Sequence, residues 1–495
     1  MTSVRTLSAS VHDPRRRISP PALAVFLAAT LGALLGALLP LARPGAVATG
    51  IGVLAVLPLA ALAWAGVARA ATITAALAYV AALAWAYASE VAPTFSYDGL
   101  TDAGPQPTAV LLVATVAALP AAWLPLAPRR PSTVVLWVLY LLGYVPTVVV
   151  PLFMRGDLAA VLPFDLALLA SMGIASLIVR RPPAPIAMRP LSLNAFTGLL
   201  VGLGLLCSAY IAVTFGVSLS LPGLASVYDT RADFRAAVGG SAAVAGYIVP
   251  WAGNVINPLL MALGVARRRA EIVTLGIVGQ LLIYSVTGFK SILFSVALVP
   301  LVYLAISVAS RVFGLLAAVV APVIIACCLI ATSTWGSIWP LAITARLFAT
   351  PGQVGFYYYE YFSDHPSYAL SQSILSWVVS RPYGEDVPFV IGSAYFSEGT
   401  NANGNIWADA FANFGFAGIV CFTLVLGLVL WIADGLAQGR DARVAGPMFA
   451  IAGLSLANSA LFTTVLTLGL ALGCLLIALM PPAPGHAARP SRVTR

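Results

Sequence analysis

The feature that most constrains this chain is a nearly unbroken series of apolar segments. Each is about 18–23 residues long, enough for a helix to cross a hydrocarbon core of about 30 Å. Charged residues make up only 9% of the chain, against about 25% in an average soluble domain. The sequence therefore predicts an all-α polytopic membrane protein with about 14 transmembrane helices. The expected spans are 20–42, 46–67, 70–92, 108–127, 132–153, 158–179, 193–215, 242–265, 271–288, 291–309, 313–333, 406–432, 445–461 and 464–480.

One long polar stretch interrupts the apolar series after the eleventh expected span. It is rich in Tyr, Arg, Asp, Glu and Asn. A membrane protein that only moves a solute seldom needs such a loop, so the loop favours chemistry on a membrane-anchored substrate. The expected order is a basic tail (1–19), spans one to eleven (20–333), a large late extracytoplasmic loop (334–405), spans twelve to fourteen (406–480) and a second tail (481–495).

The basic residues indicate the orientation. Cytoplasmic loops carry the excess of Lys and Arg, and most of the arginines fall on the side of the N-terminus. Both termini are therefore expected in the cytoplasm and the late loop on the outer face. The net charge of +9 then reflects membrane topology and not a nucleic-acid surface. The acidic residues expected outside are Asp98, Asp102, Asp157, Asp229, Asp233, Glu360, Asp364, Glu385, Asp386 and Glu398.

The sequence gives no sign of a metal site or of disulfides. The five cysteines (Cys207, Cys327, Cys328, Cys421 and Cys474) all fall inside expected spans. Of the three histidines, only His365 is expected on the outer face. No Cys and His cluster has metal-ligand spacing. We therefore expect no metal and no cofactor.

Lys290 is the only lysine of the chain, and it lies in an apolar run that covers about residues 271–309. A single helix of that length would measure about 58 Å, almost twice the hydrocarbon core. The chain must therefore turn near Gly288, which places Lys290 at the outer boundary of the bilayer. Lys290 is a candidate for binding an anionic group. The alternative is a lysine that snorkels from a helix end.

A charged segment before the eighth expected span carries a pair of arginines. If this segment is helical, Arg231 and Arg235 share one face. Two guanidinium groups on one face suit the bidentate binding of a pyrophosphate. The alternative is a solvated amphipathic helix in which Asp229 and Asp233 pair with the arginines. Further cations expected on the outer face include Arg346 and Arg381.

An aromatic and acidic run lies within the late loop. In helical geometry Glu360 and Asp364 share one face, with Tyr357 and Tyr358 just before them and His365 just after. Aromatic rings offer flat apolar surfaces to a sugar ring, and carboxylates accept hydrogen bonds from its hydroxyls. The alternative is an interfacial belt of aromatic residues.

The strongest polar pattern lies where the chain enters the twelfth expected span. Asn405, Asp409 and Asn413 recur every four residues, so they line one helix face. Asn401 and Asn403 precede them. A carboxylate about one turn inside a membrane segment is costly unless it faces a polar cavity. This face is therefore a candidate site for orienting sugar hydroxyls.

These features together resemble the bacterial O-antigen or oligosaccharide repeat-unit polymerases, the Wzy-type family. The resemblance rests on the Asn401–Gly418 stretch, the Thr287–Ser291 turn, the Tyr228–Arg235 run and the late loop, and it covers roughly residues 195–430. It implies a GT-C-like, metal-independent glycosyltransferase of the bacterial plasma membrane. Such an enzyme moves a growing glycan from a polyprenyl pyrophosphate onto a newly flipped lipid-linked repeat unit.

The resemblance implies roles for the candidate residues. Those expected to stabilise the pyrophosphate leaving group are Arg231, Arg235, Lys290, Arg346 and Arg381. The candidate bases for the acceptor hydroxyl are Asp409, Glu360 and His365, among which the sequence does not decide. The candidate sugar ligands are Asn401, Asn403, Asn405, Asn413, Tyr357, Tyr358 and Asp364. The implied partners are lipid-linked donor and acceptor oligosaccharides, membrane lipid, and a chain-length regulator or flippase.

Two other functions fit parts of the pattern. The related O-antigen ligases use a His in a late outer loop, where His365 lies, but the residues around His365 do not reproduce their Gly-rich pattern. A flippase for lipid-linked glycans would also have many spans, but its cations belong in a central cavity. A ligase-like transferase is the main alternative, and a flippase or transporter is the second.

Overall fold

The chain is helical throughout the part that the computed structural model describes. That part comprises residues 68–183, 186, 188–216, 227–238, 244–372 and 377–483, and no β-strand occurs within these ranges. The expected spans 20–42 and 46–67 lie outside the described residues, as do the tail 1–19 and residues 484–495. The all-α class is confirmed for the described ranges.

Ten segments of the described residues are long and apolar enough to cross a membrane, which confirms a multi-pass membrane protein. They are α3–η2–α4 (Ala68–Thr94), α6–η5–α7 (Pro131–Arg155), α8 (Leu158–Arg180), α9 (Leu193–Phe215), α11–η6–α12 (Ala245–Arg267), α13 (Ala270–Thr287), α14 (Lys290–Val308), α15 (Phe313–Trp335), α19 (Ile406–Leu436) and α21–α22 (Leu461–Leu479). Two shorter apolar helices are α5–η4 (Pro107–Ala122) and α20 (Ala442–Leu456). Every expected span from 70–92 onward therefore has a helical counterpart.

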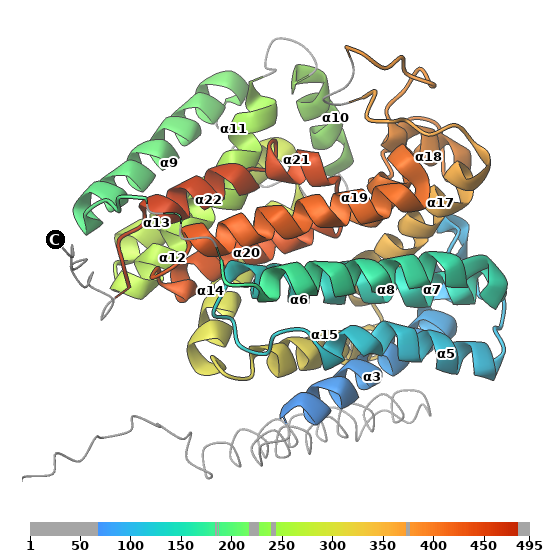
Figure 1. Cartoon of the computed structure of the whole chain (residues 1–495). Coiled ribbons are helices and arrows are strands. Elements are labelled where there is room, and N and C mark those ends of the chain that lie inside the picture. Colours follow the sequence, from blue (N-terminus) through green and yellow to red (C-terminus); the bar gives the residue numbers. More distant parts are fainter. Residues whose placement is uncertain are drawn as a thin grey trace, which may run out of the picture.

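Most of these helices run side by side in one bundle (Figure 1). Helices far apart in the sequence pack together, since α15 lies against α3, α8 against α19, and α20 against α6. Short connections between consecutive helices gather the helix ends into two groups, one at each end of the bundle. The two ends differ in charge.

At one end, arginine side chains hold the helix termini together. Arg130 donates to the Val179 carbonyl, Arg180 to that of Trp123, and Arg440 to that of Ala478. The opposite end, termed the α17 end, carries the acids Asp98, Asp102, Asp157, Glu360, Asp364, Glu385, Asp386 and Glu398. The α17 end also carries Arg155 and Arg381, which pair with Glu360 and Asp386, and Asp441 lies near Arg440 at the other end. Which end faces the cytoplasm stays a prediction.

The predicted late loop is largely helical and belongs to the bundle. It contains α16 (Trp339–Thr344), η7 (Ala345–Ala349), α17 (Thr350–Asp364) and α18 (Val387–Tyr395). Helix α17 packs against α7 and α19. A Cβ atom on Gly352 would stand 2.2 Å from the Pro146 carbonyl oxygen, so only glycine allows this close approach. The first half of α17 is buried and is therefore core.

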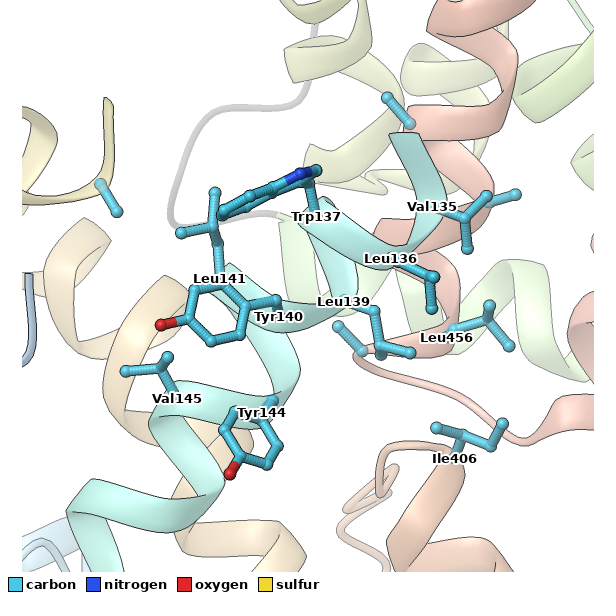
Figure 2. Close-up of a cluster of buried hydrophobic side chains, with 14 of the residues drawn as sticks. Val135, Leu136, Trp137, Leu139, Tyr140, Leu141, Tyr144, Val145, Ile406 and Leu456 are labelled. Carbon is cyan, nitrogen blue, oxygen red and sulfur yellow. The ribbon is translucent and has the colours of Figure 1, made fainter. Parts of the chain in front are cut away.

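A cluster of buried apolar side chains around η5 (Tyr140–Tyr144), in the middle of the Pro131–Arg155 segment, brings two further chain segments together (Figure 2). Ile406, at the start of α19, and Leu456, at the end of α20, lie on the same side of this turn as Leu139. All three side chains are buried. The cluster thus positions the start of α19 relative to the end of α20, and these two segments border the cavity described next.

Candidate functional site

A cavity of about 290 Å³ opens between α17, the start of α19 and the connection from α20 to α21 (Leu461–Val465). Its lining residues are Tyr358, Leu370, Gln372, Asp386, Val387, Pro388, Phe389, Asn401, Asn403, Gly404, Asp409, Asn413, Ser459, Ala460, Phe462 and Thr463. Five of the predicted site residues are in this set: Tyr358, Asn401, Asn403, Asp409 and Asn413. The structure therefore brings together residues from α17, from the 401–404 loop and from α19.

The start of α19 is set by a side-chain cap. The Asn405 side-chain oxygen accepts from the backbone N–H groups of Trp407 (3.1 Å) and Ala408 (3.0 Å), which otherwise lack partners at a helix N-terminus. Its amide donates to the Thr147 hydroxyl at 2.9 Å. Asn405 is buried and does not line the cavity. The structure thus gives Asn405 a capping role where a sugar ligand was predicted.

Asp409 lies one turn further along α19, at the cavity wall, and the residue is 7% exposed. The Asn413 amide donates to the Asp409 carboxylate at 3.2 Å and to its backbone carbonyl at 2.8 Å. The Asn413 side-chain oxygen accepts from the Leu370 N–H at 2.7 Å. Asn413 therefore orients the carboxylate and ties the loop after α17 to α19. Phe414 and Gly415 have non-helical backbone angles and mark a kink just after this turn.

Tyr358 forms the wall of the cavity on α17. Its hydroxyl donates to the Ala402 carbonyl at 2.9 Å and accepts from the Gly404 N–H at 3.2 Å. Burial raises the pKa of Tyr358 above its ordinary value, so the phenol stays neutral over the physiological range. These two bonds hold the 401–404 loop against α17, with Asn401 and Asn403 exposed at the cavity.

A second carboxylate lies at the rim of the cavity. Asp386 accepts an ion-pair contact from Arg381 at 3.1 Å, and its side chain is 53% exposed. Beside it, the Gln372 side-chain oxygen accepts from the Val387 N–H at 2.9 Å. Arg381, predicted as a pyrophosphate ligand, thus reaches the cavity only through Asp386, because it is not one of the lining residues.

Sequence reasoning missed Gln372, Asp386, Ser459 and Thr463 as members of the site. Asp386 was recognised as an outer-face acid but not linked to Asp409, because nothing local connects residues 23 positions apart. Ser459 and Thr463 fall at the boundary of two short expected spans. A usable signal was present there, since the polar pair Asn458-Ser459 interrupts an otherwise apolar run.

Four predicted residues of the α17 region lie outside the cavity lining. Glu360 forms an ion pair with Arg155, and Asp364 is exposed at the end of α17. The exposed His365 ring stacks on Tyr361 with ring centroids 4.0 Å apart. The Tyr357 hydroxyl donates to the Gly99 carbonyl. Glu360 and His365 as bases, and Tyr357 and Asp364 as sugar ligands, therefore stay predictions for residues that do not line this cavity.

Three of the predicted cations gather at the turn between α13 and α14. This turn passes through Gly288 with φ of +62°, and Lys290 is the first residue of α14, as the sequence predicted. Helix α10 (Val227–Val238) lies beside it. Arg231 on α10 donates to the Gly288 carbonyl at 3.0 Å, and Arg235 is exposed one turn later. Arg346 lies apart from this group on η7, which packs against η2 and α7.

The cationic turn and the cavity lie on neighbouring parts of the bundle. A small apolar cluster that includes Phe234, Ile283 and Ile292 packs α10 against α13 and α14. On the other side, the α20–α21 connection supplies Ser459 to the cavity, and α21 leads from there to Leu466, whose carbonyl accepts from the Trp251 indole at 3.1 Å. Helix α21 and Leu466 therefore link the cavity to α11, next to α10. No Lys or Arg is among the residues that line the cavity.

Within the described ranges, no group of three or more His, Cys, Asp or Glu residues is arranged to hold a metal ion. The five cysteines are all free thiols. Asp386 and Asp409 are the only members of these residue types in the cavity lining. The carboxylate, amide and hydroxyl groups of the lining can form hydrogen bonds and transfer protons.

Comparison with known proteins leaves the function to be argued from the site. No protein-family model, no curated protein and no solved structure matches this chain. A helical membrane bundle supports many activities, so the fold class does not choose among them.

Proposed function

We propose that the protein is a glycosyltransferase that polymerises polyprenyl-pyrophosphate-linked oligosaccharide repeat units on the outer face of the plasma membrane. The observation that carries the proposal is the cavity at the α17 end, where Asp409, Asn413, Asn401, Asn403 and Tyr358 converge. Carboxylate and amide groups next to an aromatic side chain suit a polyhydroxylated ring. A membrane-depth carboxylate that faces a cavity is a functional site by default.

Asp409 is the best of the three candidate bases, because Glu360 is paired with Arg155 and His365 is outside the cavity lining. In the proposed step an acceptor hydroxyl transfers its proton to the Asp409 carboxylate. The hydroxyl oxygen attacks the anomeric carbon of the donor and forms the new glycosidic bond. The bond from that carbon to the pyrophosphate oxygen breaks, and its electron pair leaves with the polyprenyl pyrophosphate.

The leaving group needs positive charge, because negative charge builds up on the pyrophosphate oxygens. The cationic turn with Lys290, Arg231 and Arg235 is the proposed binding site for the donor pyrophosphate. The turn lies near α11, whose Trp251 donates to the Leu466 carbonyl just after α21, and this contact supports a donor site near the cavity. Arg381 at the rim is a further cation close to the cavity.

A flippase needs a polar passage between both faces of the bundle. The cavity instead lies at one end, between the α19 start and α17, which favours a transferase. A ligase-like transferase would act on the same lipid-linked substrates. The experiment below therefore includes an outcome that identifies a ligase.

The test is complementation of a gene deletion, followed by sizing of lipid-linked and surface glycans. Wild type is expected to restore long chains, whereas Asp409→Asn is expected to leave single repeat units, with polymerisation at least about 100-fold slower. The matched control is Glu398→Gln, an exposed acid at the same end outside the cavity lining, which should restore long chains. Unchanged chain length in the deletion would refute the polymerase. Long glycan retained on the lipid carrier would instead identify a ligase.

A further inference from the structure

The chemical character of the cavity points to the kind of sugar that enters it. The polar lining side chains are two carboxylates, four amides and three hydroxyls, which belong to Asp386, Asp409, Gln372, Asn401, Asn403, Asn413, Tyr358, Ser459 and Thr463. No basic side chain lines the cavity. Arg381, a cation at the rim of the cavity, forms an ion pair with Asp386. A negative charge on a bound sugar would therefore meet Asp409 with no cation in the lining, while the Arg381 cation at the rim is already paired with Asp386.

The two carboxylates occupy different depths. Asp409 is 7% exposed, and Asp386 at the rim has a side chain that is 53% exposed. A sugar ring that enters must pass the rim and approach Asp409 within hydrogen-bond reach of about 2.6–3.2 Å. Charges of equal sign at such short range repel strongly where water is partly excluded. An anionic ring is thus disfavoured at the base of the cavity beside Asp409, and at the rim Asp386 already occupies Arg381, the cation that would otherwise attract it.

The hydrogen-bond groups complement an uncharged polyol. Several of them already have protein partners, because Asn413 binds Asp409 and Leu370, and Tyr358 binds Ala402 and Gly404. Asn401 and Asn403 remain as exposed amides at the cavity. Sugar hydroxyls both donate and accept, so they can donate to the carboxylates and accept from these amides. A carboxylate in place of the C6 hydroxyl only accepts, so it offers no donor to Asp386 or Asp409 at that position.

The size of the cavity limits how much of the glycan it takes. Its volume of about 290 Å³ is at the lower end of the range for small-molecule sites, about 300–1,000 Å³. The cavity therefore accommodates about one monosaccharide, and the rest of an oligosaccharide must lie outside it. The identity of that single ring is what the cavity can select.

We propose that the cavity is a subsite for one uncharged monosaccharide of the acceptor and that it excludes uronic acids and other anionic sugars, with Asp386 as a specificity-determining residue. The assignment to the acceptor rests on the proposed glycosyltransferase function. The selectivity of the cavity is a binding property, and it can be measured without turnover.

The test uses the purified full-length protein in lipid nanodiscs and ligand-observed NMR. The probes are methyl glycosides of glucose, galactose and mannose, together with the matching uronates, which differ only at C6. Neutral glycosides are expected to bind at least about ten-fold more tightly than their uronates. Thr463→Trp, which fills the cavity, should abolish neutral binding, whereas Ser363→Trp at the exposed end of α17 should not. Equal binding of both probe classes, or no binding of any neutral glycoside, would overturn the proposal.

Asp386→Asn separates charge selectivity from shape. It removes the rim charge and releases Arg381 from its ion pair, so uronate binding is expected to strengthen about ten-fold while neutral binding changes less than about three-fold. Unchanged uronate binding would remove Asp386 as the determinant. If neutral glycosides bind more tightly than uronates but the deletion strain makes glycans of normal length, the sugar subsite is supported and the polymerase proposal is refuted. If the deletion strain makes only single repeat units but uronates bind as tightly as neutral glycosides, only the proposed charge selectivity is refuted.

Discussion

The start of α19 and the end of α17 have similar patterns of polar and aromatic residues in the sequence, but their side chains have different surroundings in the structure. Each carries acidic side chains four residues from another polar group, with aromatic residues nearby. At the start of α19, Asp409 and Asn413 are buried side by side at a cavity. At the end of α17, Glu360 pairs with Arg155 and Asp364 is exposed. A polar pattern therefore indicates a site only where its groups converge on an accessible cavity.

The largest effect is expected where the α19 pattern joins a second segment. Asn413→Ala removes the acceptor for the partly buried Leu370 N–H and the donor to Asp409. The loss of an N–H partner costs at most about 1–3 kcal/mol, and a misplaced carboxylate slows the reaction about 10- to 100-fold. Thermal unfolding and the rate of glycan elongation in membrane vesicles measure the two effects. A variant that elongates glycan at the wild-type rate would show that Asp409 needs no such positioning.

A smaller effect is expected from the cap of α19. Asn405→Ala removes the acceptor of the Trp407 and Ala408 N–H groups, which costs about 0.5–2 kcal/mol of unfolding free energy. Asn405→Ser retains a capping side chain and should lose much less. Thermal unfolding of the two variants in the same detergent gives the comparison. Equal losses for serine and alanine would argue against capping as the role of Asn405.

The smallest effect is expected at the end of α17. Glu360→Gln breaks the ion pair with Arg155, whose side chain is 42% exposed. Such a partly exposed pair contributes about 0–1 kcal/mol, and the pair lies outside the cavity lining. Glycan chain length in the complemented strain should match wild type. Shortened glycans from this variant would make Glu360 a site residue and would weaken the distinction between the two regions.

The membrane helices could be predicted because their signal is local. An apolar run of sufficient length has few alternatives to a transmembrane helix, since every backbone N–H and C=O must be satisfied inside lipid. The turn at Gly288 followed from length alone, and the structure has it. The 334–405 segment was harder to predict, because its polar residues suggest a loop and not a helix. In the structure α17 lies within this segment and packs into the bundle through Gly352 and neighbouring buried residues.

Only the part of the candidate site that lies on a single helix, α19, could be predicted from the sequence. The four-residue spacing of Asn405, Asp409 and Asn413 predicted that they share one side of α19. It did not predict that Asn405 caps the helix while Asp409 and Asn413 line the cavity. That difference depends on Thr147, which binds Asn405, and on Leu370, which binds Asn413. Both partners are distant in the chain.

The sequence by itself determined the membrane-spanning helices and the polar face of α19, because each depends on residue type and spacing within one segment. Only the tertiary structure decided which polar residues share the cavity. Asp386 and Thr463 join Asp409 there, while Glu360 and His365 do not. The reason is physical, since the cavity forms where α17, α19 and the α20–α21 connection meet, and packing between distant segments sets that meeting point.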